Sequence, residues 1–247
     1  AKNDSGYSLK PVGAMLHNGR YTYEYPVSEG KVPQHLRSDY RSFEVNDNNL
    51  IDLINKRFIG KGGSNDVDKA PGFTRQEIKR LDAAGVVHTN DNVIFITFDD
   101  WGGDDAINKL LYVLRKHDAP ATFFIRTNNV HYNPNLLRAI AADGNEIGCH
   151  TDKHLQMTKY DGNTKKYVSI VNRDEYLLDL KGSYNTLEKV VGDVEVNGHY
   201  SLTRFFRPPT LVISKVGLEC VLDSGFEYII EGYSTKDYTA ESYLKVR

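Results

Sequence analysis

Two pairs of residues in the sequence are suited to metal or acid–base chemistry. Asp99 and Asp100 are adjacent and follow directly on the apolar run 93–98. Neighbouring carboxylates repel each other unless a cation or a proton lies between them, so the pair indicates a metal site. Acidic side chains also stabilise the N-terminus of a helix, and the pair alone favours neither interpretation.

His150 and His154 form the second pair, four positions apart. A helical or tightly turned segment would place both imidazoles on one face, as zinc requires, although such a pair also occurs on solvated faces. His150 follows a predicted strand, as Asp99 does. One Asp and two His form a three-ligand set with a free coordination position, the arrangement of a catalytic metal site.

The segments that must position these residues alternate between strand and helix patterns. Continuous apolar runs predict buried strands, whereas apolar residues at helical spacing, with caps and closing glycines, predict helices. The expected strands are 93–98, 121–125, 146–149, 204–206 and 226–230, and the expected helices are 104–117, a segment opened by Asn133-Pro134 and closed by Gly144, 172–191 and 214–223.

This order predicts a parallel sheet with helices outside, as an open doubly wound sheet or a barrel. Chemistry in such folds gathers at the carboxyl ends of the strands. The polar residues expected there are Asp99-Asp100, Arg126-Thr127-Asn128, His150 with His154, Arg207 and the stretch 231–238.

Composition excludes several classes of protein. The 247 residues carry a net charge of −2, which disfavours a nucleic-acid partner. They contain no apolar stretch of the roughly 18 residues that a membrane helix needs. Cys149 and Cys220 form neither a zinc pattern nor a redox pair, so we expect small buried side chains.

The first 72 residues carry weaker signals. Tyr21 to Tyr25 alternates like a strand, residues 49–58 favour a short helix, and the glycine-rich loop 60–66 resembles a connector or a lid. Further on, Thr74 and Glu77 form a capping box that predicts a helix start.

Three motifs together resemble those of the polysaccharide deacetylases, the NodB-homology class of carbohydrate esterase family 4. They are Thr97-Phe98-Asp99-Asp100, His150-Thr151-Asp152-Lys153-His154 and Arg207-Pro208-Pro209. The resemblance implies a distorted (β/α) barrel with fewer than eight strands over residues 90–247. Residues 1–89 are then an irregular N-terminal extension.

The resemblance also implies roles for individual residues. Asp100, His150 and His154 would bind Zn²⁺ or another divalent metal, which lowers the pKa of water towards about 7 and polarises an acetyl carbonyl. Asp99 would be the general base, and Arg207 would orient Asp99 and keep it ionised.

Further residues of the motifs would contact the substrate or support the site. Thr151 would hold the loop from His150 to His154, the histidine loop, by hydrogen bonds. Thr151, Thr210 and Tyr238 are the residues expected to bind substrate. Thr210 replaces the family's usual aromatic residue, and its backbone N–H would stabilise the oxyanion. In the partial fourth motif, which has Ser234 where the family often has an acid, Asp237 would orient a catalytic histidine.

That histidine belongs to the family's last motif, a buried strand ending in Leu-x-His, which residues 1–247 do not contain. Either the sequence ends early or the site lacks its general acid; we expect an early end, since residues 241–247 resemble the start of a helix. His17, His35, His88, His117, His131 and His199 are expected to be surface residues.

The predicted function is therefore a metal-dependent hydrolase that removes acetyl groups from an N-acetylated polysaccharide such as peptidoglycan, a chitin-like oligomer or an exopolysaccharide. The alternatives are an O-acetyl xylan esterase, a catalytically impaired carbohydrate-binding protein of the same fold, and a non-sugar amidase. We expect an acetylated glycan as partner, no nucleic acid, no membrane span, a monomer and, by the resemblance, an extracellular or cell-envelope location.

Overall fold

The computed structural model describes residues 8–9, 50–60, 67–84 and 90–239, and its centre is one curled sheet of six parallel strands. The spatial order is β2-β12-β11-β6-β5-β4. The strands are β2 (Phe58–Ile59), β4 (Thr97–Asp99), β5 (Thr122–Ile125), β6 (Glu146–Cys149), β11 (Leu202–Phe206) and β12 (Tyr228–Ile230). The curled sheet forms a half-barrel, which confirms the expected α/β barrel with fewer than eight strands.

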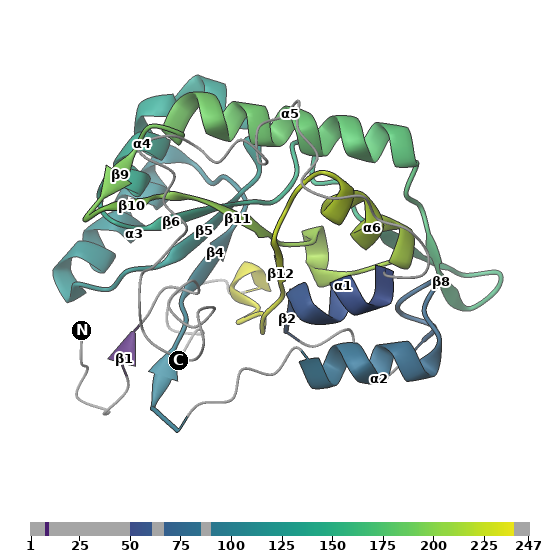
Figure 1. The fold of residues 1–247 in the computed structure, drawn as a ribbon. Coiled ribbons are helices and arrows are strands. Elements are labelled where there is room, and N and C mark those ends of the chain that lie inside the picture. Colours follow the sequence, from purple (N-terminus) through teal and green to yellow (C-terminus); the bar gives the residue numbers. More distant parts are fainter. Residues whose placement is uncertain (1–7, 10–49, 61–66, 85–89, 240–247) are drawn as a thin grey trace.

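Helices cover the outside of this sheet (Figure 1). One group lies beside β4, β5 and β6, and the other lies towards β12 and β2. The first group is α3 (Asp104–His117), α4 (Pro134–Ala142) and α5 (Arg173–Val191), and the second is α6 (Lys215–Asp223), α1 (Leu50–Arg57) and α2 (Arg75–Ala84). Each helix predicted within the described residues is therefore present, and that over 104–117 has the predicted bounds. The helix start expected at residues 241–247 lies outside the described residues.

Capping side chains explain where several helices begin. The side chains of Asn133, Asn172 and Ser214 each accept a hydrogen bond from a backbone N–H in the first turn of α4, α5 and α6. At α2, the Thr74 N–H donates to Glu77 Oε2 (2.7 Å) and the Glu77 N–H donates to Thr74 Oγ1 (3.3 Å). The predicted capping box is confirmed.

The two faces of the sheet hold two apolar clusters, because side chains alternate along a strand. Phe123 and Ile125 belong to the large cluster shared with the helices. Phe124, between them in sequence, packs with Phe205 and Ile230 in a small cluster on the concave face. Side chains at every second position from Phe124 on β5, and from Phe205 on β11, therefore point into the half-barrel.

The described part of residues 1–89 is built into this fold. Strand β2 pairs with β12, placing Phe58 opposite Ile229 and Ile59 opposite Ile230. Leu50 and Ile54 of α1 are buried in the same large cluster as the outer face of the barrel. The boundary at residue 89 remains a prediction, and the expected strand at residues 21–25 lies outside the described residues.

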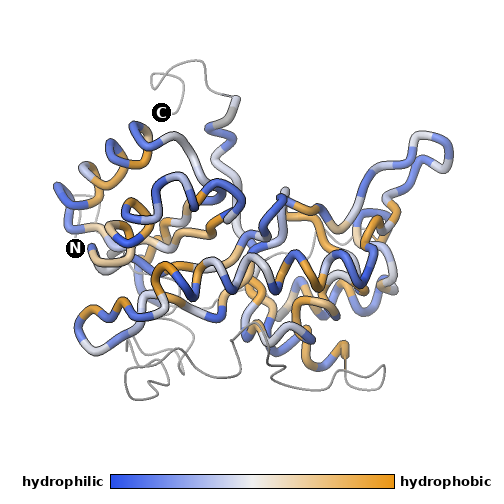
Figure 2. The backbone as a smooth tube through the Cα atoms, turned by 90° about the horizontal axis from the view of Figure 1, so that it is seen from above, coloured by the Kyte–Doolittle hydropathy of each residue, from blue (hydrophilic) through white to orange (hydrophobic). Residues whose placement is uncertain are grey.

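The structure departs from the predicted pattern in short strands. The expected strand 93–98 is divided into β3 (Val93–Ile94), which pairs with β1 (Ser8–Leu9), and β4 in the main sheet. Two antiparallel hairpins were not expected: β7 (Thr158–Asp161) with β8 (Lys166–Ser169), and β9 (Glu195–Val196) with β10 (His199–Tyr200). The β7–β8 hairpin projects from the body as a largely hydrophilic arm (Figure 2).

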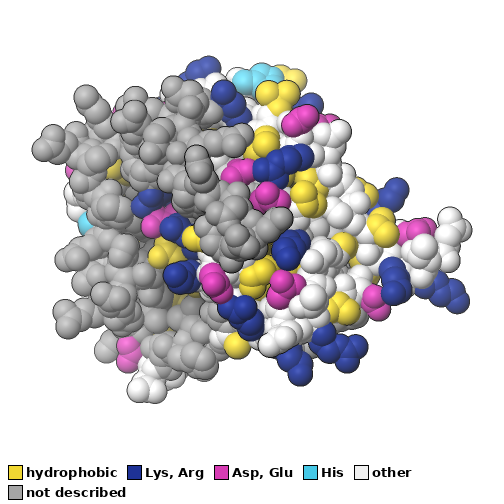
Figure 3. Space-filling model, turned by 45° about the vertical axis from the view of Figure 1, so that its right-hand side comes forward, with side chains coloured by type: hydrophobic (Ala, Val, Ile, Leu, Met, Phe, Trp, Pro, Cys, Tyr) yellow, Lys and Arg dark blue, Asp and Glu magenta, His cyan; other side chains and the backbone are white. Residues whose placement is uncertain are grey.

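Surface and burial bear on the expected partners. On the face shown in Figure 3, basic and acidic side chains of the described residues are interspersed. None of the helices in the described ranges is long and apolar enough to cross a membrane.

Cys149 and Cys220 are buried free thiols, as expected, and burial raises the pKa of Cys149 to about 12.

Phe58 tests whether residues 50–60 belong to the same folding unit as the barrel. Its side chain is fully buried in the large apolar cluster, and its strand pairs with β12. Phe58→Ala should therefore lower the free energy of unfolding by about 3–5 kcal/mol. Denaturant unfolding should still show one cooperative transition. The exposed Tyr112 provides the control, since Tyr112→Ala should change stability by no more than about 0.5 kcal/mol. A loss below about 1 kcal/mol for Phe58→Ala, or two separate transitions, would contradict this.

Candidate metal and catalytic site

The carboxyl ends of the parallel strands bring the candidate residues to one rim of the half-barrel. Asp99 is the last residue of β4 and Asp100 follows it, His150 follows β6, and Arg207 follows β11. These strands are far apart in sequence, but the order β11-β6-β5-β4 places their ends together. The structure therefore brings the ends of these strands together, as the sequence predicted.

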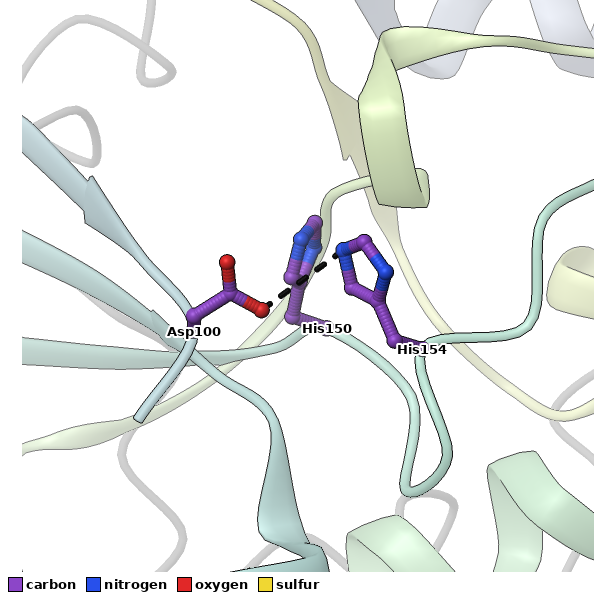
Figure 4. A group of neighbouring side chains, drawn as sticks. All are labelled: Asp100, His150 and His154. Carbon is purple, nitrogen blue, oxygen red and sulfur yellow. Dashed lines mark ion pairs between the residues drawn. The ribbon is translucent and has the colours of Figure 1, made fainter. Parts of the chain in front are cut away.

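Asp100, His150 and His154 form a group in which one potential ligand atom from each residue lies within 4.8 Å of the others. The three side chains point towards one another (Figure 4), and His154 Nε2 lies 3.6 Å from Asp100 Oδ1. Ligands at about 2.1 Å from a tetrahedral zinc ion would be about 3.4 Å apart. A small inward movement therefore suits this group to a divalent metal.

A hydrogen bond prepares His150 for this role. Its Nδ1–H donates to the backbone carbonyl oxygen of Arg207 at 2.8 Å, and a carbonyl oxygen can only accept. This bond fixes the tautomer and leaves Nε2 with its lone pair available. Burial lowers the pKa of His150, against the opposing effect of the Asp99 carboxylate, which favours the neutral form that binds metals.

Asp99 is not part of this group, and its carboxylate is paired with Arg207 instead. Arg207 Nη1 donates to Asp99 Oδ1 at 2.7 Å, and the arginine side chain is only 5% exposed. This contact is a charge-assisted hydrogen bond, which orients the carboxylate. The adjacent carboxylates thus have different partners: Asp99 faces Arg207, whereas Asp100 faces His154.

Arg207 is itself held from several directions. Its Nε and Nη2 donate to the carbonyl oxygens of Ile230 and Glu231, both at 3.1 Å, and Nη1 also donates to Thr97 Oγ1 at 2.7 Å. The guanidinium carbon lies 4.2 Å from the ring centroid of Phe124. These contacts connect β11 with β4, β5 and β12 across the concave face.

Unusual backbone conformations cluster at the site. Asp100, Thr151 and His154 have φ values of 73°, 65° and 60°, and Thr210 and Leu211 have 59° and 57°. The left-handed region costs a non-glycine residue roughly 1–2 kcal/mol. Strain of this kind persists where the surrounding structure fixes the chain, and it is frequent at functional sites.

The contacts of Thr151 support one of its two expected roles. The side chain is fully buried, and its Oγ1 accepts a hydrogen bond from the Leu155 N–H at 3.2 Å. A fully buried side chain is out of reach of a glycan. The geometry therefore supports a role in holding the histidine loop rather than in binding substrate.

The remaining predicted residues lie on the loops after β11 and β12. Thr210 is in the short 3-10 helix η4 (Pro209–Leu211), is exposed, and its hydroxyl donates to the Pro209 carbonyl oxygen at 2.7 Å. Asp237 is exposed in η5 (Asp237–Thr239) and accepts from Thr235 Oγ1 at 3.0 Å. Tyr238 lies in η5, and its side chain is outside the described part. The described contacts do not bring Asp237 to the three-residue group.

Two acidic residues near the site had no role assigned from the sequence, although Glu231 begins the stretch 231–238 that was expected at the rim. The Glu231 side chain is buried, which raises its pKa well above the usual range, and its Oε1 has no hydrogen-bond partner among the described residues. Asp179 of α5 is 7% exposed and accepts hydrogen bonds from the histidine loop. The signal available in the sequence was the helical spacing of Asp179 with the apolar residues Leu180 and Leu187 on the buried face of α5.

Comparison with known proteins identifies relatives of this chain. It is 26% identical over 164 residues to peptidoglycan-N-acetylmuramic acid deacetylase PdaC of Bacillus subtilis, covering 66% of this chain and 33% of that protein. It is 28% identical over 153 residues to a peptidoglycan-N-acetylglucosamine deacetylase of Bacillus cereus, covering 62% and 49%. The peptidoglycan-N-acetylglucosamine deacetylase PgdA of Listeria monocytogenes is 30% identical over 189 residues, covering 70% and 38%. The chain therefore spans a third to a half of the length of these relatives.

Among solved structures, the Bc1960 peptidoglycan N-acetylglucosamine deacetylase is 28% identical, with a TM-score of 0.49 and 62% of each chain covered. The profile of the polysaccharide deacetylase family matches residues 86–229, which is more than half of the 247 residues. The matched segment contains the three motifs and the Asp100, His150 and His154 group. The chain belongs to the polysaccharide deacetylase family.

Proposed function

We propose that this chain is a metal-dependent deacetylase that hydrolyses N-acetyl groups of a glycan of the peptidoglycan type. The proposal rests on the different partners of two adjacent carboxylates. Asp100 lies with His150 and His154, whereas Asp99 is paired with Arg207. A catalytic metal site needs open coordination and a nearby base that is not a ligand. Family membership and the named activities of the relatives support the same assignment.

Asp100, His150 and His154 would hold the metal. The three donors are one carboxylate and two imidazoles, a set that zinc accepts while keeping one position open. Bound there, a divalent ion would supply a Lewis acid for the acetyl carbonyl and would lower the pKa of water. The identity of the ion is part of the proposal, with zinc as the first choice.

Asp99 would act as the general base. It would take a proton from the attacking water while a C–O bond forms at the acetyl carbon, and the C–N bond then breaks to release acetate and an amine. The leaving nitrogen needs one proton, and Asp99 holds one after the first step. The histidine expected from the family's last motif would be the other source of this proton.

Arg207 and Thr210 would support this chemistry in different ways. Four hydrogen bonds and the Phe124 ring fix the Arg207 guanidinium, so Arg207 would hold Asp99 in its orientation. The backbone N–H of Thr210 would donate to the oxyanion as the carbonyl becomes tetrahedral. A backbone donor does not depend on the side chain, so a threonine in place of the family's aromatic residue retains it.

The metal assignment predicts the effect of removing one ligand at a time. His150→Ala and His154→Ala should each reduce bound zinc from one equivalent to well below one, measured by inductively coupled plasma mass spectrometry after dialysis against a dilute chelator. His131→Ala is the matched control, because His131 is exposed and stacks on Tyr132 with ring centroids 4.0 Å apart. Should both variants keep stoichiometric zinc, the ligand assignment is wrong.

The role of Asp99 predicts a loss of rate without a loss of metal. Asp99→Asn should bind zinc in the same stoichiometry but release acetate from N-acetylated peptidoglycan about 10²–10⁴ times more slowly. Acetate release is measured with a coupled enzymatic assay at saturating zinc. Unchanged acetate release would exclude Asp99 as the base.

The choice of substrate separates this proposal from its alternatives. Acetate released from acetylated xylan but not from N-acetylated glycans would indicate the O-acetyl esterase. Tight binding of N-acetylated glycan with no acetate release would indicate a carbohydrate-binding protein. A cell-envelope or extracellular location is proposed with the substrate, because peptidoglycan is found there.

A further inference from the structure

We propose that Asp179 is a positioning residue that holds the loop carrying both candidate metal-ligating histidines. The inference rests on the proposed function, because it concerns the affinity of the Asp100, His150 and His154 group for a metal. Asp179 lies on α5, and the loop it contacts connects His150 to His154. Neither the family motifs nor the roles described above include this residue.

The carboxylate uses both oxygens on the loop. Asp179 Oδ1 accepts a hydrogen bond from the Asp152 N–H at 2.7 Å, and Oδ2 accepts from the Lys153 N–H at 3.1 Å. These are two of the three residues between the histidines. Because the Asp179 side chain is only 7% exposed, water does not readily replace it as the acceptor for these N–H groups.

The loop needs outside support because its conformation is strained. Thr151 and His154 are both in the left-handed region, with φ of 65° and 60°, and no helix or strand includes residues 150–154. The strained loop therefore depends on neighbouring groups to hold it. The two bonds from Asp179 lie between the strained residues and oppose their relaxation.

The same side of α5 makes a second contact with this region. Ser183, one turn after Asp179, accepts a hydrogen bond from Thr127 Oγ1 at 3.2 Å and lies 3.2 Å from Cys149 Sγ. Thr127 Oγ1 is also 2.8 Å from Asp152 Oδ1, and the Thr127 N–H donates to the Thr151 carbonyl oxygen at 3.2 Å. Helix α5 thus fixes the end of β6 and the loop that follows it.

A carboxylate suits this position better than an amide. Two backbone N–H groups face the side chain, and each needs an acceptor. Asparagine offers one acceptor oxygen, and its NH₂ group would face the second N–H donor. Asp179→Asn should therefore remove one of the two hydrogen bonds to the loop while changing the side-chain volume very little.

The test is zinc affinity, measured by isothermal titration of the metal-free 247-residue chain in competition with a chelator of known affinity. Asp179→Asn should raise the zinc dissociation constant about 10- to 100-fold, the usual effect of removing a partner behind the ligands. At saturating zinc its kcat should remain within about threefold of the unaltered chain. Asp174→Asn, which removes a charge from an exposed position on the same helix, should leave both quantities unchanged.

A second variant, Asp179→Glu, keeps the inference testable if Asp179→Asn folds poorly. Asp179→Glu keeps two acceptor oxygens at a longer reach, so its dissociation constant should lie between those of the unaltered chain and Asp179→Asn. Unaltered zinc affinity in a folded Asp179→Asn, or in an Asp179→Glu variant with a lowered Tm, would show that Asp179 supports only the fold and would overturn the inference. Absence of zinc binding by the unaltered chain would instead overturn the proposed function, and this inference with it.

Discussion

The buried guanidinium of Arg207 is the interaction on which the rest of the site depends. A buried cation, with its side chain only 5% exposed, is costly unless it is paired and its N–H groups find acceptors. Arg207 meets this need with Asp99, Thr97 and two carbonyl oxygens of the β12 segment. Its own carbonyl oxygen accepts from His150. One residue thereby fixes the orientation of the candidate base and of a candidate metal ligand.

The curl of the sheet makes these contacts possible. Strands β4 and β12 lie on opposite sides of β11 in the sheet order, so an arginine after β11 reaches both only if the sheet bends around it. The aromatic ring of Phe124 and the small cluster with Phe205 and Ile230 fill the concave face below the rim. Residues 50–60 extend the same sheet beyond the segment that the family profile matches.

Much of this arrangement could be predicted because the signals are local. Apolar spacing and caps give the bounds of α3 and the starts of α4, α5 and α6, and the strand–helix alternation gives the rim where Asp99 and His150 lie. The pairing of β2 with β12 could not be predicted, since a two-residue strand has no period and its partner lies 171 residues away. The strands of the two antiparallel hairpins are also short, and they could not be predicted for the same reason.

The partners of buried polar groups were also beyond the sequence pattern. Burial periodicity shows which face of α5 is inside, but it does not show that Asp179 accepts two loop N–H groups. The motif around Arg207 indicates a partner for Asp99, whereas the carbonyl oxygens of Ile230 and Glu231 depend on the curled backbone. The left-handed conformations of Asp100, Thr151 and His154 likewise follow from tertiary contacts.

The central claim is that Asp100 and Asp99 have different tasks, one holding a metal and the other remaining on Arg207. A crystal of the chain soaked in zinc, with anomalous diffraction recorded on both sides of the zinc absorption edge, tests this most directly. We expect one peak bonded to Asp100, His150 and His154, with Asp99 still paired to Arg207. A peak bonded to Asp99, or zinc bound only elsewhere on the chain, would contradict it.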